Sequence, residues 1–173
     1  MELSSAIGGR RSIREYRDQD VPEELVDRLL MAAIQAPSAG NRQSWEFVVV
    51  RDVERKEDLA RAASDQEFLA KAPVILAVCA DRARSAERYG ARGADLYCIQ
   101  DCAAATQNLL LTAFSMGLGT CWVGAFDEGA VSKLLQLPED VRPLALVPVG
   151  YPAEDPEAPP RFPMQRIVHH GRF

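Results

Sequence analysis

The chain has 173 residues, of which 47% are hydrophobic and 26% are charged, and its formal net charge is −5. This length predicts one domain, 1–173, with a core of its own. The acidic balance argues against a nucleic-acid-binding surface, which needs excess positive charge, and the apolar stretches end well before the roughly 20 residues that cross a bilayer.

Cysteine and histidine usage argues against disulfides and metal binding. The cysteines lie in apolar surroundings without a CxxC pair, which is typical of small buried side chains in a reducing compartment: Cys79, Cys98, Cys102 and Cys121. His169 and His170 have no partner at metal-ligand spacing, so we expect them to face solvent. The opening residues lack the basic start and apolar run of a signal peptide, and we expect a cytoplasmic protein.

The first half of the chain predicts a helix, a strand and a second helix. Pro22 stands at a helix start, acidic residues that favour the positive helix end follow it, and Pro37 stops the helix. The β-branched run at 45–50 predicts a strand. A charged helix follows at about 53–63.

The second half begins with a continuous apolar run at 73–80, which predicts a strand buried on both faces. The segment 94–116 carries the longest helical pattern, apolar on most sides, and Gly117 ends it. Three further elements are expected, which are a strand at 119–125, a short helix at 128–137 and a strand at 144–149.

Helices and strands alternate along the chain, which predicts an α/β (α+β) fold with a mixed central sheet flanked by helices. The segment 150–173 is proline-rich and acidic, which indicates an extended C-terminal arm. A long helix that is apolar on most sides needs a large core or a partner chain to cover it. We therefore expect a homodimer in which the arm reaches across to the partner.

A cluster of arginines near the N-terminus offers an anion site despite the overall acidity. Arg10, Ser12 and Arg14 alternate along the chain, so their side chains converge on one group if the segment is extended or a loose turn. A guanidinium donates two parallel hydrogen bonds to a phosphate, and serine adds a neutral donor. On the arginines alone, a solvated basic face before a helix is the alternative. Arg17 is expected on the surface.

A turn-rich loop at 37–44 (PSAGNRQS) runs directly into the strand that Trp45 begins. Its backbone groups are free to donate hydrogen bonds, and Asn41 and Gln43 add side-chain amides. The same residue types are the commonest in turns, so an ordinary turn is the alternative interpretation. We expect Trp45 to belong to the core.

A glycine-containing segment follows the long helix. Gly117-x-Gly119 follows a helix instead of a strand and lacks both a third glycine and a Lys-Ser/Thr ending, which excludes a dinucleotide fingerprint and a P-loop. Gly119 and Gly124 would let the main chain approach a ligand closely. Trp122 either flanks a ring or belongs to the core, and Cys121 has no activating neighbour, which argues against a nucleophile.

Four motifs in one order resemble the FMN-dependent nitroreductase family, and they span nearly the whole chain. They are Arg10-x-Ser12-x-Arg14, Pro37-Ser38-x-x-Asn41-x-Gln43-x-Trp45, Gly117-Leu118-Gly119-Thr120-Cys121-Trp122-Val123-Gly124 and Pro160-Arg161-Phe162-Pro163. The resemblance implies an intertwined homodimer with FMN at the interface. The arginines would hold the phosphate, the partner's loop would touch the ring and ribityl chain, and 121–124 would lie along one face of the ring.

The cofactor contacts implied by the resemblance are Arg10, Arg11, Ser12, Arg14, Pro37, Ser38, Ala39, Asn41, Gln43, Cys121, Trp122, Val123, Gly124 and Arg161. Many family members carry a lysine two residues before this last arginine, where the present chain has Pro159. The phosphate would therefore have one cation fewer.

The resemblance also implies an NAD(P)H-dependent FMN oxidoreductase with ping-pong kinetics. NADH or NADPH would reduce the flavin and leave before an electron-poor acceptor, such as a nitroaromatic or a quinone, takes its place. The chemistry is the flavin's, so no side chain is expected to be catalytic. The alternatives are a specialised flavin enzyme, such as a dehalogenase or a metabolite oxidase, and a non-catalytic flavin-binding protein. A specialised enzyme would need a lid, for which 83–93 is the candidate, although a surface turn is the favoured interpretation of that segment.

Overall fold

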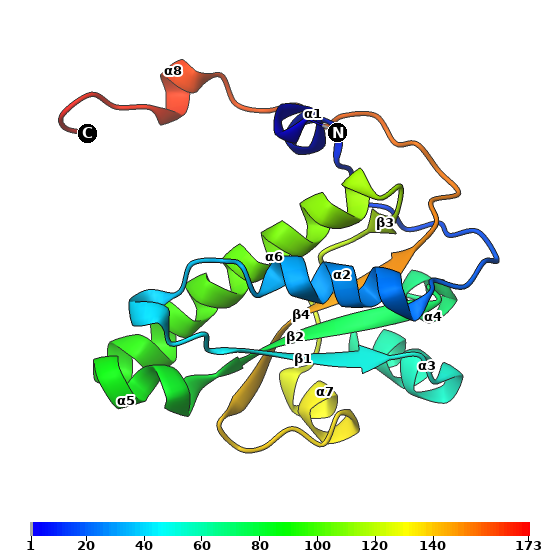
Figure 1. Cartoon of the computed structure of the whole chain (residues 1–173), viewed down its shortest axis with the longest axis horizontal. Coiled ribbons are helices and arrows are strands. Elements are labelled where there is room, and N and C mark those ends of the chain that lie inside the picture. The colour runs from blue at the N-terminus through cyan, green and yellow to red at the C-terminus, as the bar shows by residue number, and fades with distance from the viewer. Residues whose placement is uncertain (1) are drawn as a thin grey trace.

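The computed structural model describes residues 2–173 and has a four-stranded sheet at its centre. The strands are β1 (Trp45–Val50), β2 (Val74–Asp81), β3 (Gly119–Thr120) and β4 (Val141–Gly150). Their order is β1-β2-β4-β3, and each neighbouring pair is antiparallel (Figure 1). The α/β class is confirmed. The mixed character expected of the sheet is confined, among the described residues, to an isolated parallel bridge between Ser12 and Thr120.

Helices surround this sheet. They are α1 (Leu3–Gly9), α2 (Glu23–Ala33), α3 (Val53–Ala62), α4 (Phe68–Lys71), α5 (Arg82–Arg92), α6 (Cys98–Ser115), α7 (Glu128–Leu134) and α8 (Met164–Ile167). Two short helical pieces, the 3₁₀ turn η1 (Ala39–Asn41) and the π-helix η2 (Gly93–Tyr97), precede β1 and α6.

Strand β2 shows why the predicted apolar run is continuous. Val74, Leu76 and Val78 pack into the core on the side of α2 and α6. Ile75 and Ala77 point the other way, into the core with residues of α3, α4 and α7. Successive side chains of a strand alternate between its faces, so a strand covered on both faces is apolar at every position.

Aspartate side chains begin three of the helices. Asp52, Asp81 and Asp127 each accept a hydrogen bond from a backbone N–H in the first turn of α3, α5 and α7, at 2.8–2.9 Å. Such caps satisfy donors that have no partner within the helix. Helix α6 ends before Gly117, as predicted.

Two predicted elements differ from the structure. The strand expected at 119–125 is limited to β3 and a bridge between Val123 and Leu146, with an unpaired stretch between them. The surface turn favoured for 83–93 is wrong, because this segment is helix α5. Asp81 supplies its N-cap, and the arginine and alanine residues that follow are good helix formers.

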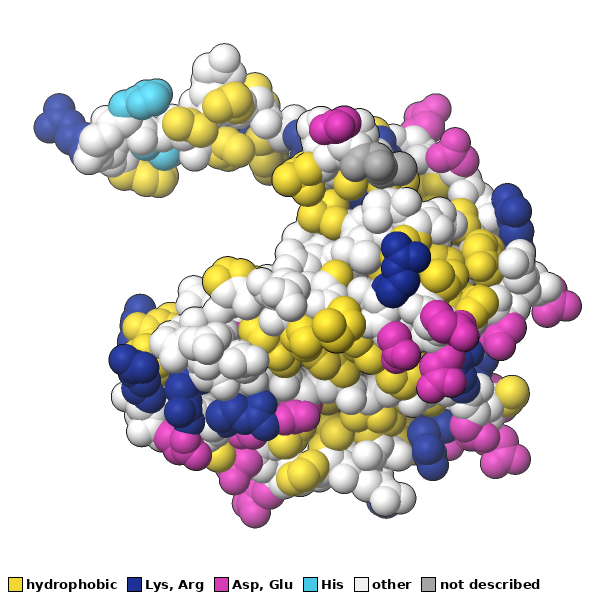
Figure 2. Space-filling model, in the orientation of Figure 1, with side chains coloured by type: hydrophobic (Ala, Val, Ile, Leu, Met, Phe, Trp, Pro, Cys, Tyr) yellow, Lys and Arg dark blue, Asp and Glu magenta, His cyan; other side chains and the backbone are white. Residues whose placement is uncertain are grey.

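The C-terminal segment, residues 153–173, leaves the sheet after β4 and runs past α1 away from the body of the molecule (Figure 1). Most of its side chains are exposed, including His169 and His170 as predicted. Elsewhere in the chain, the four cysteines are buried, as predicted. Figure 2 shows a hollow between this segment and the rest of the surface. Across residues 2–173, no helix combines the length and apolar character that a membrane crossing requires.

Candidate functional site

The N-terminal arginine segment lies against the residues that follow α6. Ser12 forms a parallel bridge with Thr120, and the Ile13 N–H donates to the Thr120 carbonyl at 2.8 Å. Gly119 permits this approach, because a Cβ atom there would lie 2.8 Å from the Ile13 side chain. Residues 10–14 are thereby held beside the segment 119–124. This contact brings two of the predicted cofactor motifs together.

The environment of Cys121 shows where the side chains of this segment converge. Burial raises the pKa of the Cys121 thiol, while Arg14, a hydrogen bond with Ser12, and Arg10 act in the opposite direction. Both cations and the hydroxyl therefore act on the same buried sulfur. A raised pKa keeps the thiol protonated near neutral pH, which agrees with the prediction that Cys121 is no nucleophile.

The arginines predicted to hold a phosphate have uncommitted side chains. Within residues 2–173, no carboxylate lies at ion-pair distance from the guanidinium of Arg10, Arg14 or Arg161. The Arg14 guanidinium lies 5.8 Å from the centre of the Phe68 ring, and Arg161 donates to the Pro159 and Pro160 carbonyls at 3.4 Å. Free guanidinium donors beside a serine hydroxyl suit a phosphate.

Two other arginines of the N-terminal segment are bound locally. Arg11 donates to the carbonyls of Gly8 and Arg10 at 2.7 and 2.9 Å. Arg17 is exposed, as predicted, and donates to the Pro152 carbonyl at 3.0 Å. A carboxylate at the start of the C-terminal segment, Glu154, accepts hydrogen bonds from the backbone of residues 14 and 15. The N-terminal arginine segment is thus hydrogen-bonded to the start of the C-terminal segment.

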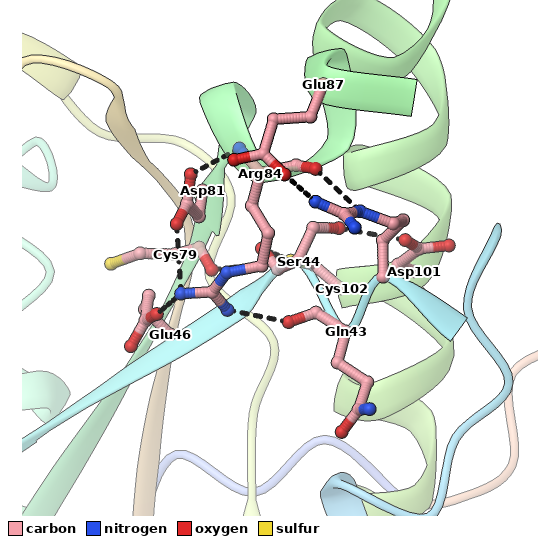
Figure 3. Close-up of polar contacts among 10 residues, drawn as sticks. Gln43, Ser44, Glu46, Cys79, Asp81, Arg84, Glu87, Asp101 and Cys102 are labelled. Carbon is pink, nitrogen blue, oxygen red and sulfur yellow. Dashed lines mark hydrogen bonds and ion pairs between the residues drawn. The ribbon is translucent and has the colours of Figure 1, made fainter. Parts of the chain in front are cut away.

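The loop at 37–44 is anchored to α6 by Asp101, a residue that the sequence analysis missed. Asp101 is only 5% exposed, and one of its carboxylate oxygens accepts from the Ala39 N–H at 2.9 Å. The other accepts from the Ser44 hydroxyl at 2.8 Å (Figure 3). A signal was available, because Asp101 is the one charged residue of α6. Charged side chains are rarely buried unless they are paired.

Two arginines fasten the same loop to α5 (Figure 3). Arg42 donates to the Arg84 carbonyl at 2.9 Å and forms an ion pair with Glu87. Arg84 donates in return to the Gln43 carbonyl at 2.8 Å and forms an ion pair with Glu46. The loop is therefore held by α5 and α6 together.

The backbone of this loop is strained. Gly40, Asn41 and Gln43 have φ values of 54°, 54° and 50°, in the left-handed region that non-glycine residues rarely adopt. A side chain at Gly40 would also meet the Tyr89 hydroxyl, 2.4 Å from an ideal Cβ. Strained residues held in place by surrounding contacts cluster at functional sites.

The two predicted halves of the site lie at opposite ends of α6. Ala39 bonds to Asp101 in the first turn of the helix, whereas Gly9 packs against Phe114 in the last turn. At 1.5 Å per residue, these turns are about 20 Å apart, as the positions of α5 and β3 at the two ends of α6 in Figure 1 illustrate. The structure therefore brings the segments 10–14 and 119–124 together and keeps the loop of the same chain away from them.

The tryptophans have different environments. Trp45 is buried in the core, as predicted. Trp122 is 40% exposed, which decides against a core role and leaves its indole free to flank a ligand. Beside it, the Val123 N–H is already bonded to the Leu146 carbonyl, at 3.0 Å. Among the described residues, nothing but the Trp122 indole approaches an ideal Cβ at Gly124, at 3.8 Å.

Comparisons with known proteins agree on one family. Residues 7–67 and 60–151 match the Nitroreductase family. A Methanothermobacter thermautotrophicus protein with the provisional name NADH dehydrogenase/NAD(P)H nitroreductase is 40% identical over 172 residues, covering 96% of this chain and 86% of that protein. The FMN reductase [NAD(P)H] of Bacillus subtilis is 33% identical over 185 residues, covering 99% and 74%. The structure of the Vibrio harveyi NADPH:FMN oxidoreductase in complex with NAD+ superimposes with a TM-score of 0.91 at 30% identity, covering 99% and 77%.

Proposed function

We propose, from the premise that this chain belongs to the nitroreductase family, that segments 10–14 and 119–124 of one protomer and loop 37–43 of a second bind one FMN. The chain is an NAD(P)H-dependent oxidoreductase with FMN as its cofactor, as the names of its relatives indicate. When bound, FMN would supply the electron-transfer chemistry, with the reduced nicotinamide as the two-electron donor and a second substrate as the acceptor. Its acceptor is a nitroaromatic or a quinone, which binds after the nicotinamide has left, so that the kinetics are ping-pong.

The observation that carries this proposal is the set of uncommitted donors beside Cys121. Arg10, Ser12 and Arg14 all act on the Cys121 thiol, and within residues 2–173 neither guanidinium has a carboxylate at ion-pair distance, so a phosphate would suit these donors. Arg161 adds a cation from the C-terminal segment, and Pro159 leaves the phosphate with one cation fewer than in many family members. Arg11 contributes through its backbone, because its side chain is already bonded to the carbonyls of Gly8 and Arg10.

Segment 121–124 and the exposed Trp122 indole would hold the ring of the flavin on one side. The N–H of Val123 is used within the sheet, so the donors on this side come from its neighbours Trp122 and Gly124. On the other side, the fastened loop presents Pro37, Ser38, Ala39, Asn41 and Gln43. These residues orient the ring and exclude water, and none of them supplies a proton, which leaves protonation to solvent.

The distance between the two halves of the site supports a homodimer. If both halves contact one ring, they must come from two chains, because in a single chain they lie at opposite ends of α6. Apolar side chains that a second copy would cover are exposed on α1, α2 and the C-terminal segment, among them Leu3, Ile7, Met31, Phe162 and Met164. Exposed apolar side chains that lie together are typical of an interface, and the hollow in Figure 2 offers room for the partner.

The test is a visible absorbance spectrum of the purified protein before and after anaerobic addition of NADH or NADPH. A yellow protein that bleaches, and recovers its colour with a nitroaromatic or a quinone, is the expected result. Flavin that binds but never bleaches would instead indicate a binding protein or a specialised electron donor. A colourless protein that FMN does not reconstitute would contradict the proposal.

A further inference from the structure

The end of α5 carries two arginines without acidic partners. Arg88 and Arg92 are exposed, and no aspartate or glutamate of the described chain lies within ion-pair distance of either. Their neighbours Arg42, Arg82 and Arg84 all form ion pairs. In Figure 2, a group of Lys and Arg side chains lies over α5. This end of the helix therefore presents uncompensated positive charge.

Two tyrosines join the arginines into one patch. The Arg88 guanidinium lies 5.5 Å from the centre of the Tyr89 ring, and that of Arg92 lies 5.3 Å from the Tyr97 ring. The Tyr89 and Tyr97 rings meet edge to face with centroids 5.1 Å apart, and Arg92 Nε is 2.9 Å from the Tyr97 hydroxyl. Cations and aromatic rings thus alternate over a short distance. We call these four residues the α5 patch.

The α5 patch adjoins the loop proposed to contact the flavin. An ideal Cβ at Gly40 would lie 2.4 Å from the Tyr89 hydroxyl and 2.9 Å from Arg88 Nη1. Arg42 and Arg84 bind the same loop to α5 through the contacts described above. A ligand stacked on a flavin beside loop 37–43 therefore has the patch at its edge. This step rests on the proposed function.

The backbone supports a ligand-binding role for this region. The chain bends at Gly90 (φ 55°, ψ −142°), where its backbone is not helical, and this bend separates Arg88 from Arg92. Backbone with positive φ therefore occurs on both sides of the contact, at residues 40, 41 and 43 in the loop and at residue 90 in α5. Positive charges on one surface repel one another, and a bound anion reduces that repulsion.

We propose that Arg88, Tyr89, Arg92 and Tyr97 recognise the anionic group of the ligand that exchanges electrons with the flavin. The guanidinium groups take a phosphate or carboxylate, and the tyrosine rings take the planar part of the molecule next to it. Two sources supply such a group, namely the 2′-phosphate of NADPH and the carboxylate of an aromatic acceptor. The patch selects for charge and takes no part in electron transfer.

The experiment compares charged and uncharged members of two ligand pairs on the FMN-loaded protein. Dissociation constants are measured by calorimetry for NADP+ against NAD+ and for 4-nitrobenzoate against nitrobenzene. The variants are Arg88→Gln, Arg92→Gln and the double variant. Arg55→Gln, which removes an exposed charge from α3, is the matched control. Arg88→Lys keeps the positive charge but removes the planar guanidinium that donates two parallel hydrogen bonds. Turnover of NADH with 1,4-benzoquinone, a pair without either anionic group, reports on the proposed function separately.

The expected result is that the double variant binds the charged member of one pair about tenfold or more weakly, the loss that a charge-assisted hydrogen bond produces. Binding of the uncharged member, FMN content and benzoquinone turnover stay within twofold of the control. Weakening confined to NADP+ identifies the nicotinamide phosphate as the ligand group, and weakening confined to 4-nitrobenzoate identifies the acceptor. Equal binding of charged and uncharged members by the unaltered protein, or no difference between the double variant and Arg55→Gln, overturns the inference. If the unaltered protein does not reduce benzoquinone with NADH, the proposed function is contradicted instead.

Discussion

The Asp101 carboxylate accepts a hydrogen bond from the backbone N–H of Ala39 at 2.9 Å, across 62 residues of sequence. Its second oxygen accepts from the Ser44 hydroxyl at 2.8 Å. One buried side chain therefore fixes both ends of the loop proposed to contact FMN. We regard Asp101 as a positioning residue, because it reaches the cofactor only through that loop.

Replacement of Asp101 should weaken FMN binding and lower stability together. Asp101→Ala leaves the Ala39 N–H and the Ser44 hydroxyl without their partner, which costs about 1–3 kcal/mol of unfolding free energy. Asp101→Asn keeps one acceptor and should lose less. Urea unfolding of the apoprotein and fluorescence titration with FMN measure the two effects. Glu139→Ala, an exposed site in the loop before β4, is the control. FMN affinity equal to that of the control would remove the positioning role.

The phosphate assignment predicts that Arg14→Ala and Arg161→Ala weaken FMN binding without unfolding the protein. Neither guanidinium has an ion-pair partner within residues 2–173, so each removal costs little stability. Loss of a charge-assisted contact to phosphate should raise the dissociation constant roughly tenfold to a hundredfold. Equilibrium dialysis against FMN measures this change. Arg55→Ala and Arg166→Ala serve as controls on the body and on the C-terminal segment, and unchanged flavin occupancy in both test variants would defeat the assignment.

Assembly of the site from two chains predicts complementation between defective chains. Arg14→Ala impairs the phosphate side and Asn41→Gly impairs the loop, without adding strain at a residue with φ of 54°. In a heterodimer of the two variants, one site carries both defects and the other carries neither. We therefore expect the purified heterodimer, selected with two different affinity tags, to bind FMN at one site with the affinity of the unaltered protein. Two equally weakened sites would mean that each site is built from a single chain.

The buried thiols should be unreactive in the folded protein. Burial raises the pKa of Cys79 to about 12, with a smaller contribution from Glu46, and burial also raises the pKa of Cys121. The thiolate is the reactive form, so reaction with DTNB at pH 8 should be far slower in native than in urea-unfolded protein. Cys121→Ser should leave turnover within a few fold. Complete loss of turnover would assign the sulfur a role in the reaction.

The ion pair between α7 and β4 predicts a pH-dependent contribution to stability. Arg142 donates two hydrogen bonds of 2.8 Å to Glu128, and these lower the pKa of that carboxyl below its ordinary value of 4.5. The contribution is therefore complete above about pH 4.5 and is lost as the pH falls through the lowered pKa. Both side chains are more than a third exposed, so solvent limits the effect of Glu128→Gln to less than about 1 kcal/mol at pH 7. Urea midpoints at pH 7 and pH 4 should show a smaller difference at the lower pH, and a larger one there would reverse the sign of the coupling.

Most of the secondary structure could be predicted from the sequence, because apolar periodicity, helix caps and helix-ending glycines act within a few residues of one another. The apolar run of β2 requires burial on both faces, and the spacing within α6 requires a helix that ends at Gly117. The arginine and serine chemistry of segment 10–14 likewise indicated an anion site, because guanidinium geometry is a property of the side chain alone. Helix α5 was missed because its start depends on Asp81, whose capping role competes with its place at the end of β2.

Tertiary structure alone decided which of these pieces meet. Alternation of helices and strands carries no information on strand direction, and the antiparallel order β1-β2-β4-β3 appears only when the chain is folded. The bond between Asp101 and Ala39, and the contact of Gly40 with Tyr89, join residues far apart in sequence that no periodicity relates. The length of α6 then separates the loop from the arginines. By itself the sequence predicted which residues bind the cofactor, and the packing around α6 decided that one chain does not bring them together.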